Sequence, residues 1–271
     1  MPTNAWRVIF HPPFDGPTNM AIDQAIMEAV GKRLVSPTLR FYAWQPACLS
    51  LGYGQFSREA DLERINAQGW GLVRRATGGK AILHTDELTY SIAFPEDHPI
   101  VEGDILTSYR RLSVALLNGL HQLGVAAEST PLHEPPKTTG PVCFEVPSNY
   151  EITWQGRKLV GSAQVRRANA VLQHGSIPLW GDVARICEAL VFENEPDRTS
   201  AKARVRQRAC TVEDALGVEL DWAKVAYTMA EAFGITFDVP FGATALSQAE
   251  EDRAADLIRD TYANATWNLR R

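Results

Sequence analysis

The sequence predicts a mixed-sheet α/β or α+β domain, in which a mixed β-sheet is flanked by helices. Strand-like and helix-like segments are interleaved irregularly along the 271 residues, without the strict β-α-β rhythm of a doubly wound sheet. No internal repeat, low-complexity tract or obvious linker interrupts the chain. Residues 1–271 are therefore interpreted as one domain.

Short segments rich in apolar residues, bounded by turn residues, predict the strands. In the first part of the chain these are Trp6–Phe10, Leu39–Ala43, Cys48–Leu51, Leu72–Arg75, Ala81–His84 and Leu88–Phe94. Beyond the middle they are Tyr150–Trp154, Lys158–Val165, Ala170–Gln173 and Ser176–Leu179. A hairpin is expected around Gln155-Gly156.

Apolar residues that recur at helical spacing predict the helices. The first runs from Pro17 to about Lys32, and a short one is expected over Arg58–Gln68. The clearest runs from Asp104 to Leu123, where leucines repeat at intervals of three and four. The last third of the chain is mostly helical, with capping-box patterns that begin at Thr211 and Ser247.

Composition and charge exclude several classes of function. The chain has 27 Lys and Arg against 32 Asp and Glu, a net charge of −5, which argues against a dedicated nucleic-acid binder. A hydrophobic fraction of 45% excludes disorder for most of the chain. No apolar run approaches the ~18 residues that span a bilayer, and the N-terminus does not resemble a signal peptide. We expect a cytoplasmic protein that does not bind membranes.

The cysteines show no metal-binding or disulfide pattern. Cys48, Cys143, Cys187 and Cys210 are scattered, and no C-x-x-C pair occurs. The histidines show no spacing typical of metal ligands either, so no metal site is expected. Each cysteine is then a small buried hydrophobe or a reactive thiol, and Cys143 is the candidate for reactivity.

Two segments suggest a place for an acyl group and a nucleophile. Gly78-Gly79, between two predicted strands, would let the backbone approach a ligand closely, although a plain hairpin turn gives the same pattern. Cys143 follows the Pro- and Gly-rich loop Pro131–Pro141, where a thiol could meet a substrate. Thiolates suit acyl transfer because the resulting thioester remains activated. A loop thiol packed against Phe144 is the alternative.

Two further segments could support that chemistry. Lys158 lies in Gly156–Gln164, and an ammonium beside a thiol would stabilise the thiolate, although a solvated lysine is the alternative. His174 could act as a general acid or base, or be a histidine satisfied within a strand. Asp86 and Glu87 are adjacent and directly precede a predicted strand, so their side chains should point to opposite faces and not form an acid–base pair.

Taken together and in this order, these motifs resemble the lipoate/octanoate-protein ligase and transferase family. Within it they are most similar to octanoyltransferases that take the acyl group from acyl carrier protein. The matching segments are Arg74–Gly79, His84–Ser91, Cys143–Glu151, Gly156–Gln164 and Leu172–Ile177. They span roughly the middle half of the chain.

The resemblance implies a fold and a set of residue roles. The fold is the catalytic domain shared by biotin and lipoate protein ligases. Cys143 matches the nucleophile and Lys158 the lysine that activates it. The substrate-binding positions implied are Arg75, Thr77, Gly78, Gly79, His84, Gly161, Ser162, Ala163, Gln164, His174 and Gly175.

The resemblance also implies a reaction and its partners. Octanoyl-acyl carrier protein would donate the octanoyl group from its phosphopantetheine arm to Cys143. A lysine of the glycine-cleavage H protein, or of another lipoyl domain, would then accept it. No cofactor is implied for the enzyme itself. Because acyl carrier proteins are acidic, we expect a basic mouth at the site, formed by Arg74, Arg75, Lys80, Arg157, Lys158, Arg166 and Arg167.

Three other interpretations compete. An ATP-dependent lipoate ligase would share the fold but need no catalytic cysteine. An amidotransferase between lipoyl domains would also use a cysteine, so Cys143 does not separate it from the octanoyltransferase. The strings Asp86–Ser91 and Leu172–Ile177 favour the octanoyltransferase. A non-catalytic lipoyl- or acyl-binding module would leave the pairing of Cys143 with Lys158 without a purpose.

Overall fold

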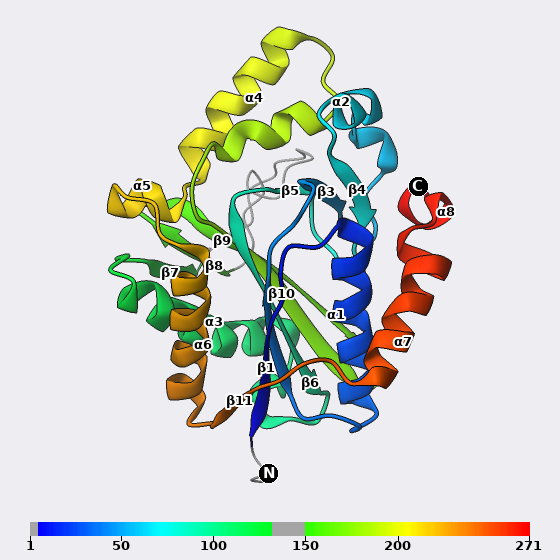
Figure 1. The fold of residues 1–271 in the computed structure, drawn as a ribbon. Coiled ribbons are helices and arrows are strands. Elements are labelled where there is room, and N and C mark those ends of the chain that lie inside the picture. The colour runs from blue at the N-terminus through cyan, green and yellow to red at the C-terminus, as the bar shows by residue number, and fades with distance from the viewer. Residues whose placement is uncertain (1–4, 132–149) are drawn as a thin grey trace.

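A large mixed sheet forms the centre of the computed structural model, which describes residues 5–131 and 150–271. Figure 1 shows its strands running through the middle of the molecule between two layers of helices. In spatial order they are β11 (Phe241–Ala243), β1 (Trp6–Phe10), β2 (Thr38–Tyr42), β6 (Glu87–Pro95), β10 (Ala170–Pro178), β9 (Arg157–Arg167), β8 (Tyr150–Trp154) and β7 (Glu128–Pro131). β11, β1 and β2 pair in parallel, and the other neighbours pair antiparallel. The predicted mixed sheet is confirmed.

A second, smaller sheet lies beside one end of the large one (Figure 1). Its order is β4 (Gly71–Arg74), β3 (Cys48–Leu51) and β5 (Ile82–His84). β3 pairs in parallel with β4 and antiparallel with β5, so it separates the two strands that flank Gly78-Gly79. The glycine pair therefore lies in a crossover between non-adjacent strands, and the alternative of a hairpin turn is wrong.

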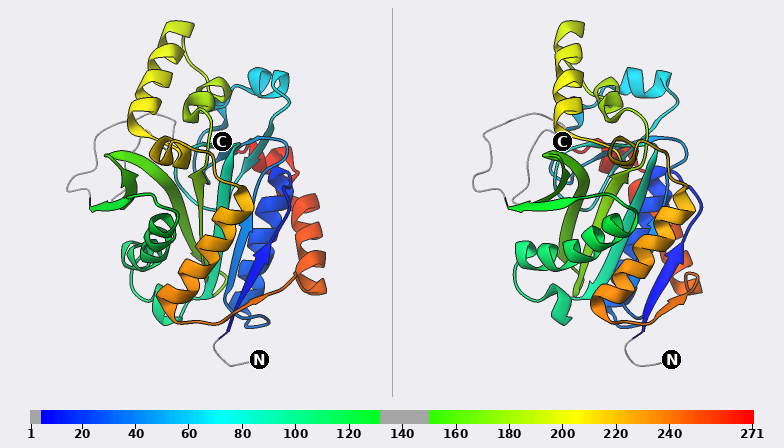
Figure 2. Two further views of the ribbon diagram at one scale, coloured as in Figure 1. Left: turned by 60° about the vertical axis from the view of Figure 1, so that its left-hand side comes forward. Right: turned by 90° about the vertical axis from the view of Figure 1, so that its left-hand side faces the viewer.

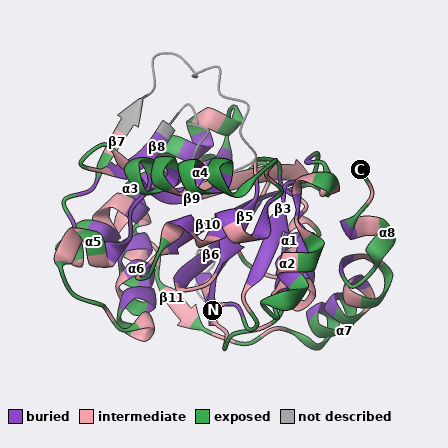
Figure 3. Cartoon of the chain, turned by 90° about the horizontal axis from the view of Figure 1, so that it is seen from above, coloured by how far each residue is buried: buried purple, intermediate pink, exposed green. Residues whose placement is uncertain are grey.

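Two pairs of helices cover the two faces of the large sheet, as the views in Figure 2 show. α3 (Ile105–Gln122) and α6 (Trp222–Phe237) pack on one face, where leucines of α3 meet apolar side chains of β2 and β6. α1 (Gly16–Gly31) and α7 (Gln248–Leu257) pack on the other. The central strands are buried on both sides, as the purple strands in Figure 3 show.

The remaining helices are short or cover the smaller sheet. They are α2 (Leu62–Ala67), α4 (Glu195–Arg208), α5 (Val212–Leu216) and α8 (Ala265–Asn268), with the short helical turns η1 (Ser57–Glu59), η2 (Pro99–Val101), η4 (Val183–Ala189) and η5 (Ile258–Tyr262). A third apolar cluster joins the smaller sheet to η4 and α4. None of the helices in residues 5–131 and 150–271 has the length and hydropathy needed to span a bilayer.

Most predicted elements are confirmed within one or two residues. The helix predicted over Asp104–Leu123 is α3, whose first turn is capped by the Asp104 side chain. Both capping boxes form, at Thr211 and at Ser247. The bounds of β1, β3 and β8 coincide with the predicted strands. Except for Pro131, which ends β7, the predicted loop 131–141 lies outside the described residues.

In two places the predicted number of elements is wrong. The helix expected over Arg58–Gln68 is split into η1 and α2, because Ala60 takes an extended conformation and bridges Leu190. The strands predicted on either side of His174 and Gly175 are one continuous strand, β10. Gly175 does not interrupt the ladder, since it pairs with Tyr90 on β6 and Ser162 on β9.

Candidate active site

A nearly closed pocket lies where α1, the large sheet and the smaller sheet meet. Its empty volume is about 420 Å³, the open mouth included. The floor consists of almost fully buried side chains, among them Met20, Tyr42, Trp44 and Thr89. At the other end, Gly79 is exposed and Ser162 is half-buried. The pocket is therefore closed at the indole of Trp44 and open beside the glycine turn.

The structure brings most of the predicted substrate-binding residues to this pocket. Those that line it are Arg75, Gly79, His84, Gly161, Ser162, Ala163, His174 and Gly175. The register of the sheet explains how distant segments meet there. Gly161 pairs with Ser176, Ser162 with Gly175, and Ala163 with His174, so two motifs form one continuous wall.

The other predicted residues do not line the pocket. Thr77 lies fully buried behind its wall, and the carbonyl of Gly78 accepts a hydrogen bond from Arg75. The side chain of Gln164 turns away, toward Ser108 on α3. Cys143, the predicted nucleophile, lies outside the described residues.

Lys158 lies near one end of β9 and does not line the pocket. Its Nζ is 2.9 Å from Oε1 of Glu151 on β8, and both side chains are at least 90% buried. Its main chain forms a bridge with Ala209, after the end of α4. A carboxylate partner stabilises the charged form of a buried lysine. The ammonium is therefore fixed in place by β8, three residues along β9 from the pocket wall at Gly161.

Arg75 is a buried clamp on the glycine turn. Its Nη2 donates to the carbonyls of Gly78 and Lys80 at 2.8 and 2.7 Å, and its Nη1 donates to the carbonyl of Ser50 at 3.0 Å. Its Nε donates to Thr77 Oγ1 at 3.1 Å. A guanidinium has five N–H donors in a rigid plane, so these bonds fix the turn against β3.

A first chain of hydrogen bonds connects α1 to this turn. Asp23 Oδ2 lies 3.4 Å from Nδ1 of His174, and Nε2 of His174 lies 2.7 Å from Thr77 Oγ1. Burial opposes ionisation of Asp23, but Arg40 and the hydrogen bonds from His174 and Ser91 outweigh it and lower its pKa to about 2. The ionised carboxylate only accepts, so Nδ1 carries the proton and Nε2 accepts from Thr77.

Burial also lowers the pKa of His174, against the opposing effect of Asp23. The imidazole is therefore neutral at pH 7, as its acceptor role toward Thr77 requires. Arg40, which pairs with Asp23 at 2.7 Å, is itself fully buried. The chain thus begins in a compensated ion pair beneath the sheet and ends at the pocket rim.

A second chain of the same kind lines the pocket floor. Nδ1 of His84 lies 2.6 Å from Oε1 of Glu87, and Nε2 of His84 lies 2.8 Å from Ser50 Oγ. Burial opposes ionisation of Glu87, but His84, Ser176 and Thr89 together lower its pKa. The polar atoms of the floor are thus satisfied within the wall, and the pocket presents mostly apolar surface.

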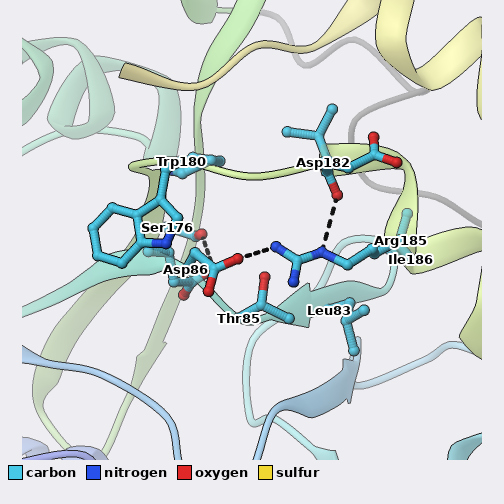
Figure 4. A pocket seen from close by; sticks show the side chains of 11 residues that line it. Leu83, Thr85, Asp86, Ser176, Trp180, Asp182, Arg185 and Ile186 are labelled. Atoms are coloured by element: carbon cyan, nitrogen blue, oxygen red, sulfur yellow. Dashed lines mark hydrogen bonds and ion pairs between the residues drawn. The ribbon is translucent and has the colours of Figure 1, made fainter. Parts of the chain in front are cut away.

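A second hollow lies on the other side of this wall. Figure 4 shows Asp86 on the turn between β5 and β6 reaching the guanidinium of Arg185, on η4, across it. Ser176 lines both hollows, and Glu87 lines the second. Asp86 pairs with Arg185 and Glu87 with His84, so the two carboxylates have different partners, although both line the second hollow.

Four of the seven residues predicted to form a basic mouth do not form one: Arg74, Arg75, Lys158 and Arg166. Arg74 and Arg75 are buried and donate to backbone carbonyls, and Lys158 is buried against Glu151. Arg166 donates to the carbonyls of Val101 and Gly103 beside α3. Because a guanidinium can satisfy buried carbonyls, arginines clustered in sequence here stabilise loops. Arg157 lines a surface hollow, and Lys80 and Arg167 are partly buried.

The described cysteines are packing residues. Cys48, Cys187 and Cys210 are fully buried. Burial raises the pKa of the Cys48 thiol well above its usual range and that of Cys210 to about 12. Thiols of this kind are poor nucleophiles at neutral pH. No group of three or more potential metal ligands comes together in the parts of the chain that the structure describes.

Several residues of the site were not predicted. They are Asp23, Glu87 and the pocket-lining residues Met20, Tyr42, Trp44, Ser50, Ile82, Thr89 and Ser176. A signal for Asp23 was present, because Asn19 and Asp23 interrupt the buried face of α1 four residues apart. Arg40, within an apolar strand, marked the place of their charged partner.

Comparison with known proteins is consistent with this site. The octanoyltransferase LipM of Moorella thermoacetica is 42% identical over 274 residues, covering 100% of both chains. The octanoyltransferase LipM of Brevibacillus brevis is 38% identical, covering 98% of this chain and 99% of its own.

The fold also matches solved structures. A chain in the structure of the bipartite lipoate protein ligase and its E2 lipoyl domain from Thermoplasma acidophilum superimposes with a TM-score of 0.81 at 24% identity, over 98% of this chain and 96% of its own. The expected ligase fold is thereby confirmed. The family model of the lipoyl protein ligase A/B catalytic domain matches residues 15–234. This chain belongs to the lipoyl protein ligase A/B catalytic domain family.

Proposed function

We propose that this chain is an octanoyltransferase that moves an octanoyl group from octanoyl-acyl carrier protein to a lysine of a lipoyl-domain protein, the glycine-cleavage H protein. The observation that carries the proposal is the closed, mostly apolar pocket, built from the motif segments of a chain that matches octanoyltransferases over their full length. A mostly apolar pocket that is closed at one end suits an unbranched acyl chain. We place the reaction in the cytoplasm.

The reaction has two halves. The Cys143 thiolate attacks the carbonyl carbon of the octanoyl thioester, and the carbon–sulfur bond to the phosphopantetheine arm breaks with release of the carrier thiol. The neutral ε-amine of the acceptor lysine then attacks the acyl-Cys143 thioester. The carbon–sulfur bond to Cys143 breaks, the amine loses its proton and an amide forms. An amide is more stable than a thioester, so neither ATP nor a cofactor is needed.

Residues of the pocket have distinct roles in this scheme. The Lys158 ammonium, fixed by Glu151, stabilises the Cys143 thiolate. Arg75 and His174 hold the glycine turn at the mouth, where the carbonyl carbon of the acyl group lies. The floor at Trp44 accommodates the end of the chain. Backbone N–H groups at the mouth can stabilise the oxyanion.

A donor comparison tests the proposal against the other interpretations. Purified protein and H protein are mixed with octanoyl-carrier, with octanoate plus ATP, or with an octanoylated lipoyl domain, and new octanoyl-lysine is measured by mass spectrometry. Product from octanoyl-carrier without ATP is expected. Product that requires ATP and the free acid would identify a ligase, and product from the octanoylated domain in preference to the carrier would identify an amidotransferase. No product from any donor would favour the interpretation as a non-catalytic binding module.

A further inference from the structure

Three hollows follow one another from the interior to the surface. Ser176 lines both the acyl pocket and the hollow that Figure 4 shows. Asp182 and Val183 line both that middle hollow and an outer one, whose empty volume is about 650 Å³ with its opening. The polar wall of Ser176 and Glu87 separates the first two hollows. The three hollows are thus neighbours that share lining residues, and the outermost lies beside the end of α4.

The chemistry of the lining changes along this row. The acyl pocket is mostly apolar, with its floor at Trp44. The middle hollow combines the Trp180 ring with the ion pair of Asp86 and Arg185. The outer hollow carries charges of both signs: the guanidiniums of Arg157 and Arg206 lie there among the carboxylates of Asp182, Glu213 and Asp214. A ligand that follows the row would be apolar at one end and polar in the middle, and an anionic group at its other end would compete with Asp182 and Asp214 for the two arginines.

Strand β9 gives the scale of this arrangement. Arg157, at its first position, lines the outer hollow, and Gly161 lines the acyl pocket. At ~3.3 Å per residue, the two positions are about 13 Å apart along the strand. Lys158 lies between them, and its main chain bridges Ala209, which lines the outer hollow. The lysine proposed to assist the nucleophile therefore lies, along β9, between the apolar pocket and the charged outer hollow.

We propose that the middle and outer hollows bind the polar arm of the acyl donor, and that Arg157 and Arg206 bind the phosphate of a 4′-phosphopantetheine thioester. Such a donor has an apolar chain, a thioester, an amide-containing linker and a phosphate, in the same order as the row of hollows. The inference rests on the proposed function. It adds a binding site, and residues for it, that the acyl-transfer scheme does not require.

The two arginines can take a phosphate in addition to their present partners. Arg157 Nη1 lies 3.3 Å from Asp214, and Arg206 Nη2 lies 2.7 Å from Asp182. The side chain of Arg206 is 54% exposed, and exposed ion pairs contribute little stability, so an anion can compete for it. A guanidinium has five donors and binds phosphate with two of them at once.

Kinetics with trimmed donors test the inference. Steady-state KM is measured for wild type, Arg157→Gln and Arg206→Gln with octanoyl-phosphopantetheine and with octanoyl-pantetheine, which lacks the phosphate. We expect KM for the phosphorylated donor to rise about tenfold in each variant, because a charge-assisted hydrogen bond is lost. KM for octanoyl-pantetheine should stay within about twofold of wild type. An equal effect on both donors, or none on either, would overturn the assignment.

A parallel experiment compares a small-molecule source of the phosphopantetheine arm with a protein-bound source. Octanoyl-coenzyme A and octanoyl-carrier both contain the phosphate, and both should lose affinity in the variants. A loss with octanoyl-carrier and none with octanoyl-coenzyme A or octanoyl-phosphopantetheine would contradict the inference, since the arginines would then contact the carrier protein itself.

Arg253→Gln is the matched control. Arg253 lies on α7, is 43% exposed and pairs with Glu28 at 2.7 Å, so it resembles Arg206 in exposure and pairing. Its substitution should change KM for none of the donors. Failure of the wild-type protein to use any thioester would refute the proposed function, whereas activity with unselective losses in the variants would refute this inference and leave that function standing.

Discussion

The Nε2 atom of His174 lies 2.7 Å from the Oγ1 atom of Thr77, and this contact ties the centre of the large sheet to the glycine turn at the pocket mouth. His174 belongs to β10, and Thr77 belongs to the crossover between β4 and β5. The two residues are 97 positions apart in sequence. Asp23 determines which atom donates, because its carboxylate accepts a hydrogen bond from Nδ1 of His174 and leaves Nε2 to accept from Thr77. Two motifs that look separate in the sequence thus act as one structural unit.

Thr77→Val tests this contact with little change in side-chain volume. The variant cannot donate to His174 or accept from Arg75, so the turn should lose its fixed position. We expect stability to fall by about 1 kcal/mol and kcat/KM for octanoyl transfer to fall up to tenfold. Thr77→Ser keeps the hydroxyl and should restore kcat/KM to near the wild-type value. Equal kcat/KM in the valine variant and wild type would show that the contact does not position the mouth.

Trp44→Ala should change the chain length that the pocket accepts. The Trp44 ring closes the pocket floor, stacked on His84 with ring centroids 3.9 Å apart. Removing it would open space beyond the end of an octanoyl chain. Two additional buried methylenes are worth ~1.6 kcal/mol, so decanoyl transfer should gain about tenfold relative to octanoyl transfer.

Trp70→Ala is the control for this prediction. Trp70 is partly buried against the smaller-sheet cluster and does not line the pocket. Its substitution should leave the ratio of decanoyl to octanoyl kcat/KM unchanged. The same ratio in Trp44→Ala as in wild type would place the floor of the acyl site elsewhere.

Gly175→Ala should be destabilising although alanine is compatible with a strand. A Cβ at this position would lie 2.5 Å from Ser162 Oγ, 2.6 Å from Tyr90 Cε1 and 2.8 Å from the carbonyl oxygen of Gly161. The wall must shift to make room, at a cost of about 1–3 kcal/mol in the free energy of unfolding. Gly242→Ala, also in a strand, has no atom within 4 Å of its Cβ and should be close to neutral. Urea unfolding of the two variants makes the comparison.

His11 should make stability depend on pH on the acid side. Burial, together with the nearby Arg40 charge, lowers the pKa of His11 from 6.5 to about 4 in the folded chain. The unfolded chain therefore takes up this proton first as pH falls. The contribution to stability is complete above about pH 6.5 and is lost between 6.5 and 4.

His11→Asn removes that titration while its Oδ1 can still accept from Arg40, which donates to His11 Nδ1 at 2.8 Å. The free energy of unfolding of the variant, measured from pH 7.5 to pH 4, should decline less steeply than that of the wild type. Parallel curves for the variant and the wild type would mean that His11 has the same pKa in the folded and the unfolded chain. Because His98 and His174 also have lowered pKa values, the difference between the two curves is the informative quantity.

The fold could be predicted from local patterns to a large extent. Apolar periodicity placed α3, and turn residues bounded β1 and β3, because each of these signals is carried by residues close together in sequence. The division of residues 57–69 was missed because Ala60 is extended through a bridge to Leu190, a contact 130 residues away in sequence. No local pattern carries that information.

The site could be predicted in part. Motif resemblance identified the wall made of Gly161–Ala163 and His174-Gly175. Its small residues allow close packing of the strands, and His174 places a polar side chain in the interior, so these residues stand out in the sequence. It missed Trp44 and Met20, which look like ordinary core residues in a strand end and a helix. The basic mouth failed because a count of arginines along the sequence does not show that Arg74 is buried among backbone carbonyls.

The most direct test of acyl transfer through Cys143 is to trap the intermediate. Wild-type protein is mixed with octanoyl-carrier, quenched within one turnover, digested and analysed for an octanoyl group, before and after H protein is added. The account predicts an octanoyl thioester on the peptide that contains Cys143, its loss as octanoyl-lysine appears at the steady-state rate or faster, and its absence in Cys143→Ser. Full turnover by Cys143→Ser, or an octanoyl group that never resides on Cys143, would contradict it.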